Sequence, residues 1–130
     1  ARGGFLMVDD FHGDEEWNNF EFALDKILPG HTVEDLVAGD SIFHTVSDVN
    51  ELIQIPGAQY IQSGVTYEKG GIVPHFRAVR DKKGRIAVVI CHNMDLGDAW
   101  EWADYPQYDE KFSGMAFRII SNYVVYSMTH

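Results

Sequence analysis

The sequence predicts a single α/β domain over residues 1–130, built as a three-layer sandwich around a mainly parallel sheet. Residues 5–8 and 86–90 are almost wholly apolar runs, which are typical of strands buried on both faces of a parallel sheet. A helical pattern follows the first run directly, and a second, longer helical pattern closes the chain. A chain of 130 residues is long enough to bury one core of this kind.

The first run, Phe-Leu-Met-Val at 5–8, predicts a strand that ends at the acidic pair Asp9 and Asp10. Residues 14–28 have apolar side chains at helical spacing and acids in the first turn, where the helix dipole favours negative charge. The Pro-Gly pair that follows ends this helix. Because a strand buried on both faces needs a neighbour on either side, we expect the N-terminal strands of the domain to lie outside this sequence.

The middle of the chain predicts shorter elements. A short strand is expected at 32–36 and a turn of helix at 41–44. Residues 46–71 predict loops with short strands, because short apolar pieces alternate with Pro and Gly. The strand-like runs at 75–80 and 85–91 flank a polar turn, so they predict a β-hairpin whose second, more apolar strand is central.

The C-terminal helix is the clearest element, because its apolar side chains recur at a helical period over four turns. They are Phe112, Met115, Ala116, Ile119, Ile120 and Tyr123, with Ser127 on the same face. This helix is expected to pack one face onto the core.

The composition excludes several classes of function. A formal net charge of -10 repels a phosphate backbone, so nucleic acid is not an expected partner, and no apolar run is long enough for direct membrane insertion. The one cysteine, Cys91, provides neither an intrachain disulfide nor a cysteine-rich zinc cluster. The short motifs of nucleotide-binding loops, zinc peptidases and serine hydrolases are absent from the sequence.

Polar side chains follow two of the predicted strands, those at 5–8 and 86–90. If these strands run parallel, their carboxyl ends share the edge of the sheet where open α/β folds bind ligands. Carboxylates and imidazoles that converge there can hold a divalent cation or exchange protons with a substrate. The candidate catalytic residues are Asp9, Asp10, His12, His92 and Asp95, and the candidate metal ligands are Asp10, His12 and Asp95. The candidate ligand-binding residues are Asp10, His12, Asn93, Asp95, Asp98, Trp100 and Glu101.

These candidates also have a structural interpretation. Asp9, Asp10 and Asp95 stand where aspartate commonly caps helices and turns by accepting backbone N–H groups. Cys91 closes an apolar run, which favours a buried structural thiol over a nucleophile.

The two indoles at Trp100 and Trp102 allow two interpretations as well. They flank an acid and could stack on a sugar ring or anchor a partner protein. In a short chain, however, Trp side chains more often belong to the core or its margin.

Three segments, GGFLMVDDFHG at 3–13, NMDLGDAWEW at 93–102 and NYVVY at 122–126, resemble a bacterial domain family of unknown function allied to the class I glutamine amidotransferase-like superfamily and its ThuA-like branch. The resemblance covers essentially the whole chain. It implies a flavodoxin-like sandwich of which this sequence is the C-terminal part. In the amidotransferases of that superfamily a nucleophilic Cys follows the strand that corresponds to the first one here. Asp9 and Asp10 occupy that turn, and a carboxylate cannot replace the thiolate in glutamine hydrolysis.

Two functions remain open. One is a catalytically inactive glutamine amidotransferase-like domain that binds a small polar ligand or assembles with a protein partner or with copies of itself, in the bacterial cytoplasm or periplasm. The alternative is a metal-assisted hydrolase that acts on a carbohydrate-like or other polar substrate, with a divalent metal ion as cofactor. The alternative requires the carboxylates to converge on one point, whereas a binding module does not.

Overall fold

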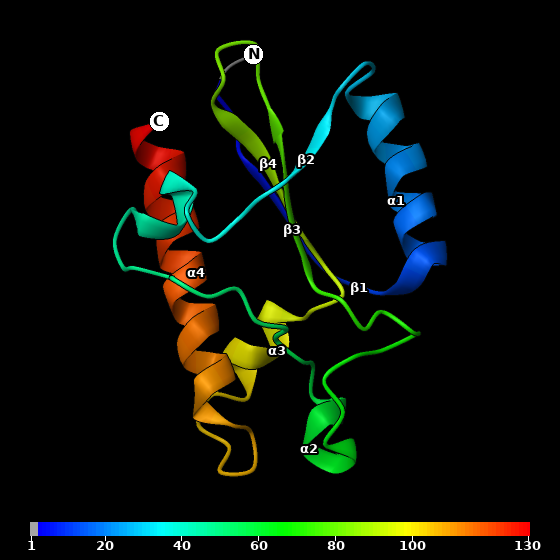
Figure 1. Cartoon of the computed structure of the whole chain (residues 1–130), viewed down its shortest axis with the longest axis vertical. Coiled ribbons are helices and arrows are strands. Elements are labelled where there is room, and N and C mark those ends of the chain that lie inside the picture. The colour runs from blue at the N-terminus through cyan, green and yellow to red at the C-terminus, as the bar shows by residue number, and fades with distance from the viewer. Residues whose placement is uncertain (1–2) are drawn as a thin grey trace.

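The computed structural model describes residues 3–130 and contains one four-stranded sheet with the strand order β1-β4-β3-β2 (Figure 1). The strands are β1 (Leu6–Phe11), β2 (Val33–Asp35), β3 (His75–Arg80) and β4 (Ile86–His92). The helices are α1 (Gly13–Ile27), the short 3-10 helix η1 (Ser41–His44), α2 (Gln59–Ser63), α3 (Leu96–Glu101) and α4 (Glu110–Thr129). The α/β class that the sequence predicts is confirmed.

The sheet is mixed. β1 pairs parallel with β4, placing Leu6 opposite Val88, whereas β3 pairs antiparallel with both β4 and β2. The prediction of a mainly parallel sheet is therefore wrong for residues 3–130, where one of the three strand pairs is parallel. The turn at 81–84 explains this, because it is too short for the crossover that a parallel pair needs. The predicted hairpin and the central position of β4 are confirmed.

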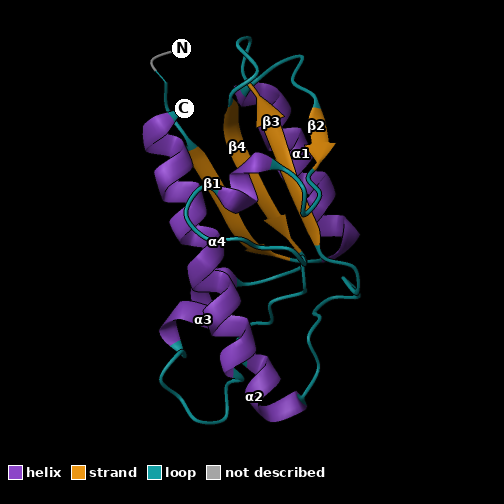
Figure 2. Cartoon of the chain, turned by 60° about the vertical axis from the view of Figure 1, so that its left-hand side comes forward, coloured by secondary structure: helices purple, strands orange, loops and turns teal. Residues whose placement is uncertain are grey.

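Helices cover both faces of the sheet, with α1 on one face and α4, α3 and η1 on the other (Figure 2). Val88 and Ile90 of β4 pack in the same cluster as Leu24 of α1, whereas Val89 and Cys91 belong to the core beneath α4. Successive side chains of a strand point to opposite faces, so the uninterrupted apolar run of β4 fills both cores.

β1 differs from the prediction in two ways. It is an edge strand of this sheet, and Leu6 is 48% exposed, so the expected burial on both faces is wrong within the described residues. It also continues past Val8 to Phe11, with a break in register between these two residues. At the break Asp10 has a φ of +57°, in the left-handed region that is sparsely populated by residues other than glycine. β1 thus carries its two aspartates inside the strand.

The remaining elements largely agree with the sequence. The two long helices, the short strand and the helical turn are present as α1, α4, β2 and η1. Residues 46–71 contain α2 and loops but no strand, so the short strands predicted there are wrong. Asn122 of α4 holds the start of this stretch, since its Oδ1 accepts from the N–H groups of Val46 and Ser47 and its Nδ2 donates to the carbonyl of Ser47. Within residues 3–130, no helix combines the length and apolarity needed to cross a membrane.

Candidate functional site

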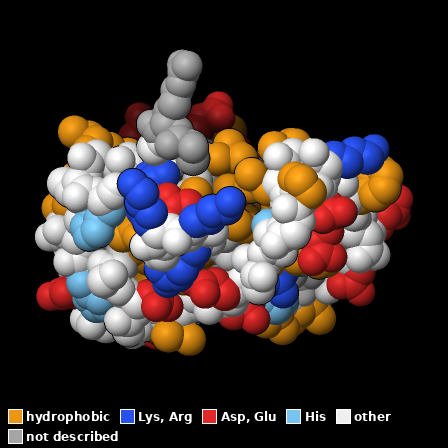
Figure 3. All heavy atoms as spheres, turned by 90° about the horizontal axis from the view of Figure 1, so that it is seen from above, with side chains coloured by type: hydrophobic (Ala, Val, Ile, Leu, Met, Phe, Trp, Pro, Cys, Tyr) orange, Lys and Arg blue, Asp and Glu red, His pale blue; other side chains and the backbone are white. Residues whose placement is uncertain are grey.

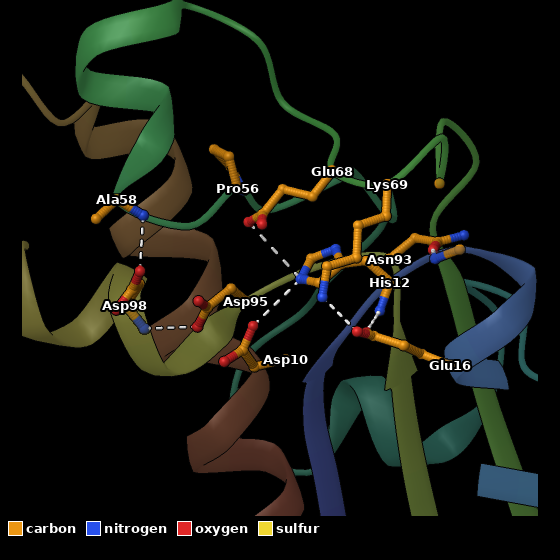
Figure 4. Close-up of polar contacts among 12 residues, drawn as sticks. Asp10, His12, Glu16, Pro56, Ala58, Glu68, Lys69, Asn93, Asp95 and Asp98 are labelled. Carbon is orange, nitrogen blue, oxygen red and sulfur yellow. Dashed lines mark hydrogen bonds and ion pairs between the residues drawn. The ribbon is translucent and has the colours of Figure 1, made fainter. Parts of the chain in front are cut away.

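The predicted ligand-binding edge lies where β1 and β4 end, because these two strands are parallel neighbours. Figure 4 shows the polar side chains that meet there. We use the name acidic rim for Asp10, Glu68, Asp95, Asp98 and the His12 imidazole. Asp10 and His12 come from the end of β1, the other two aspartates from the start of α3, and Glu68 from the loop that precedes β3.

Asp9 lies beside the rim and has a structural role. Its Oδ2 accepts hydrogen bonds from the backbone N–H groups of Leu96 (2.8 Å) and Gly97 (3.0 Å) and so ties β1 to the first turn of α3. Its Oδ1 is buried without a hydrogen-bond partner among the described residues. Burial raises the pKa of Asp9 to about 6, although the two backbone donors oppose the rise.

Asp95 caps α3 and is nearly buried, with 6% exposure. Its Oδ1 accepts from the backbone N–H of Asp98 at 2.7 Å, and its own N–H donates to the carbonyl of Ile55 at 2.9 Å. Burial, reinforced by the negative charges of Asp10 and Asp98, raises the pKa of Asp95 to about 8. At neutral pH this carboxyl group is therefore largely protonated.

Asp98 fixes the segment that crosses above α3. Its Oδ2 accepts from the backbone N–H of Ala58 at 2.7 Å, and the hydroxyl of Tyr108 donates to the carbonyl of Pro56 at 2.6 Å. A Cβ at Gly57 would lie 3.0 Å from Oδ2 of Asp95 and 3.2 Å from Oδ2 of Asp98, so only glycine fits without a shift. The carboxylates are packed directly against this loop.

Asp10, His12 and Glu68 form the part of the rim that is not used for capping. Nε2 of His12 lies 3.2 Å from Oδ1 of Asp10 and 3.8 Å from Oε1 of Glu68. The Asp10 side chain is 64% exposed, whereas His12 is 4% exposed. Nε2–H of His12 donates to Asp10. The other ring nitrogen, Nδ1, is buried and has no hydrogen-bond partner in the described part of the chain.

A second layer of contacts holds the loop that carries Glu68. The backbone N–H of His12 donates to Oε2 of Glu16 at 2.7 Å, and the other oxygen of Glu16 pairs with Lys69. A Cβ at Gly13 would lie 2.5 Å from the carbonyl oxygen of Lys69. The close approach of the loop to the start of α1 therefore requires glycine at this position.

Asn93 links the start of α1 to the loop that precedes β3. Its Oδ1 accepts from the N–H of Gly13 and its Nδ2 donates to the carbonyl of Val73, both at 2.8 Å. Asn93 has a φ of +64°. Among residues 3–130, the non-glycine residues with positive φ are Asp10, Lys69 and Asn93, and all three lie at this end of the sheet. Such conformations cost roughly 1–3 kcal/mol each and cluster at functional sites.

His92 is brought close to the rim, but both of its ring nitrogens are occupied. Nε2 donates to the carbonyl of Gly13 at 3.0 Å, and Nδ1 accepts from Arg77 at 3.3 Å. The ring stacks between Phe11 and His75, and burial lowers the pKa of His92. This arrangement favours the neutral imidazole and uses both of its nitrogens to hold neighbouring groups in place.

Three other candidates lie outside the rim. Trp100 packs against the core and its buried Nε1 has no partner among the residues described, while Glu101 is exposed on α3. Cys91 is completely buried, and burial raises the pKa of its thiol well above the usual value. These positions favour the packing interpretation for Trp100 and Cys91.

Sequence reasoning missed Glu68, Lys69 and the segment 54–58, all of which lie in the stretch predicted to be irregular. The available signals there were the Pro56-Gly57 pair and the glycines at 70–71, which mark turns but not their positions in space.

The rim is not a preformed metal centre. In the described part of the chain, no three His, Cys, Asp or Glu side chains converge so that they could hold a metal ion. The cavities of about 470 and about 930 Å³ are lined by residues outside the rim. The rim offers one exposed acid, Asp10, two partly buried acids, Glu68 and Asp98, the nearly buried Asp95 and a buried imidazole with an unpaired nitrogen.

A protein-family model described as Domain of unknown function (DUF4159) matches residues 1–128 of the chain. A comparison with curated proteins finds no match to the chain.

Proposed function

The chain belongs to the DUF4159 family, and we propose that it is a non-catalytic binding module whose acidic rim takes the cationic group of a small polar ligand or of a partner protein. The scaffold we propose for it is an inactive glutamine amidotransferase-like domain of flavodoxin-like layout. The resemblance described above is the support for that affiliation.

The contrast between Asp10 and its neighbours carries the proposal. Asp9, Asp95 and Asp98 each accept a backbone N–H and so hold the chain in place. Among the described residues, the Asp10 side chain accepts only from His12, and it remains 64% exposed. A charged side chain kept accessible on a left-handed backbone, at a cost of roughly 1–3 kcal/mol, is typical of a residue retained for binding.

The electrostatics of the rim favour a cation. Asp10 and Glu68 are directed at the same imidazole nitrogen, and the nearby Lys69 is already paired with Glu16. An ammonium or guanidinium group that bridges the two carboxylates would relieve their mutual repulsion and form charge-assisted hydrogen bonds.

Glutamine hydrolysis is not part of the proposal. That reaction needs a thiolate at the position which, by the resemblance, corresponds to Asp9 and Asp10 of this chain. Cys91 cannot supply it, because its thiol is buried in the core and its pKa is raised.

One observation favours the alternative, a metal-assisted hydrolase. The raised pKa of Asp95, about 8, makes it a proton donor at neutral pH next to the exposed Asp10, and an acid paired with a carboxylate is the usual equipment for hydrolysis. This function would need a metal ion drawn from solution to Asp10, with His12 as a further ligand while Asp95 acts as the acid.

The test of the binding module uses arginine methyl ester and spermidine as cationic probes, followed by calorimetry and thermal unfolding at low ionic strength. We expect both probes to raise the melting temperature of the wild type and of Glu21→Gln, a matched loss of one exposed charge in the middle of α1. Asp10→Asn and Glu68→Gln should lose most of the shift. An equal shift in all four proteins, or none in any, would refute the proposal.

The alternative is tested on the same proteins with Mg²⁺, Mn²⁺ and Zn²⁺ in place of the cationic probes, and with p-nitrophenyl glycosides and esters as substrates. Stoichiometric binding of one metal together with turnover that disappears in Asp10→Asn and Asp95→Asn would establish the hydrolase. Absence of turnover with every metal would leave the binding module.

A further inference from the structure

A second recessed surface lies at the opposite end of the sheet from the rim, where β4 begins. It is a groove of about 930 Å³ between the end of α1 and the β3–β4 hairpin. We call it the hairpin groove and define it by Ile27, Leu28, Arg80, Lys82, Lys83 and Arg85. None of these residues takes part in the proposed function.

The hairpin concentrates positive charge in a strongly acidic chain. Four of the ten Lys and Arg residues lie within residues 80–85, although the net charge of the chain is -10. Figure 3, which views this end of the molecule, shows Lys and Arg side chains gathered beside hydrophobic ones. A local reversal of sign of this kind attracts anions to one place on an otherwise repelling surface.

The two arginines and the two lysines of the hairpin have different roles. Arg80 pairs with Glu34 at 2.5 Å and Arg85 with Asp81 at 3.2 Å, so both guanidinium groups hold the hairpin in shape. Lys82 and Lys83 are exposed and have no ion-pair partner in residues 3–130. Their charge is available to a ligand.

The other wall of the groove is apolar. Ile27 and Leu28, at the end of α1, are 70% and 36% exposed. These two neighbouring side chains give the recess an apolar wall that a hydrocarbon group can contact.

We propose that the hairpin groove binds a small organic anion with an apolar body. Its carboxylate or phosphate group would contact Lys82 and Lys83, and its hydrocarbon part would lie on Ile27 and Leu28. The volume of the groove, about 930 Å³, is within the range of small-molecule sites. A bilayer fits this surface less well, because the groove is concave and the net charge of -10 opposes approach to an anionic membrane.

The experiment measures binding of octyl phosphate, kept below its micelle concentration, and of inorganic phosphate to the whole chain by calorimetry. We expect octyl phosphate to bind at least about tenfold more tightly, since part of its alkyl chain leaves water. The Lys82→Gln/Lys83→Gln variant should weaken this binding at least about tenfold, which corresponds to losing contacts with a charged group. Ile27→Ser should abolish the preference for octyl phosphate over phosphate.

The matched control is Lys111→Gln/Arg118→Gln, which removes two exposed positive charges from α4 and should bind octyl phosphate as the wild type does. Equal affinity for the two probes, or an equal loss in the control and the lysine variant, would overturn the proposal. Sedimentation of the protein with phosphatidylglycerol vesicles in the absence of octyl phosphate binding would also overturn it and assign the groove to a membrane. Unchanged circular dichroism and melting temperature of each variant would show that the fold is intact.

Discussion

The two ends of β4 carry charge in opposite ways. At the carboxyl end the acidic rim contains a nearly buried Asp95, 6% exposed, and carboxylates tied to backbone N–H groups. At the amino end, Lys82 and Lys83 are exposed and touch no carboxylate of the described residues. A buried carboxyl group needs specific hydrogen-bond donors and has a displaced pKa, whereas an exposed lysine is open to contact with a ligand.

This difference separates two kinds of site. Substitutions at the rim are expected to change stability and its pH dependence as well as binding, because the same groups fix the backbone. Substitutions of the two unpaired lysines of the hairpin groove, Lys82 and Lys83, are expected to change binding alone. Four substitutions distinguish effects on stability from effects on binding, and the first has the largest expected effect.

Asn93→Ala should cause the largest loss of stability, about 2–4 kcal/mol. Asn93 is 5% exposed, and its side chain joins Gly13 to Val73, so the substitution leaves a buried N–H and a partly buried carbonyl without these partners. The measurement is urea unfolding, with Asn93→Gly as a variant that keeps the left-handed backbone and Asn50→Ala as an exposed control. A loss below about 0.5 kcal/mol, the usual range for surface substitutions, would contradict the role given to Asn93.

Asp95→Asn should change the pH dependence of stability. The folded protein keeps a proton on Asp95 up to a pKa of about 8, whereas the unfolded chain releases it near the ordinary value of 3.8. The wild type therefore loses unfolding free energy as pH rises from about 4 to 8. The asparagine side chain still accepts the hydrogen bond from Asp98 but does not titrate. The unfolding free energy of the variant therefore does not show this fall with pH.

The measurement is the unfolding free energy of both proteins between pH 6.5 and pH 9, a window above the pKa of about 6 for Asp9. Across this window, the unfolding free energy of Asp95→Asn relative to that of the wild type should rise by more than about 1 kcal/mol. Asp104→Asn, which removes an exposed charge, serves as the control. Parallel curves for the wild type and Asp95→Asn would show that the carboxyl group titrates normally.

Much of the fold could be predicted from the sequence because its strongest patterns are local. The helical spacing in α1 and α4, the apolar run of β4 and the turn at 81–84 each specify an element without information from the rest of the chain. The direction of the strand pairs was harder to predict, since an uninterrupted apolar run fits a central strand of either orientation. The short turn at 81–84 makes β3 and β4 antiparallel, whereas the apolar runs had favoured a mainly parallel sheet.

The site was predicted in part for the same reason. Asp10, His12 and Asp95 follow apolar runs that predict strands, so the sequence predicts them at one edge of the sheet. The parallel pairing of β1 and β4 brings them together. Glu68 reaches the rim through a long loop whose path is set by the contacts of Gly13 and Lys69. No periodic pattern encodes such contacts, which depend on close approach between distant segments.

Asp10→Asn should raise stability slightly, by about 0.5 kcal/mol at pH 7.5. The substitution removes a negative charge that acts on Asp95, and Asn tolerates the φ of +57° at this position. The pKa of Asp95, raised mainly by burial, should fall when this charge is removed, as followed by carboxyl carbon NMR. Loss of stability in Asp10→Asn, with Glu21→Gln unchanged, would mean that Asp10 is a structural residue and would weaken the proposed binding role.

Lys82→Gln/Lys83→Gln should have the smallest effect, within about 0.5 kcal/mol of the wild type. The reason is that Arg80 and Arg85, through Glu34, Asp81 and backbone carbonyls, hold the hairpin without the lysines. Arg85→Gln in the same hairpin is therefore expected to lower the urea midpoint more than the double lysine variant does. If the lysine variant were the less stable of the two, any loss of anion binding there could reflect a distorted hairpin. If it unfolds like the wild type, that loss measures the contact between the lysines and the ligand, and the two ends of β4 differ as described.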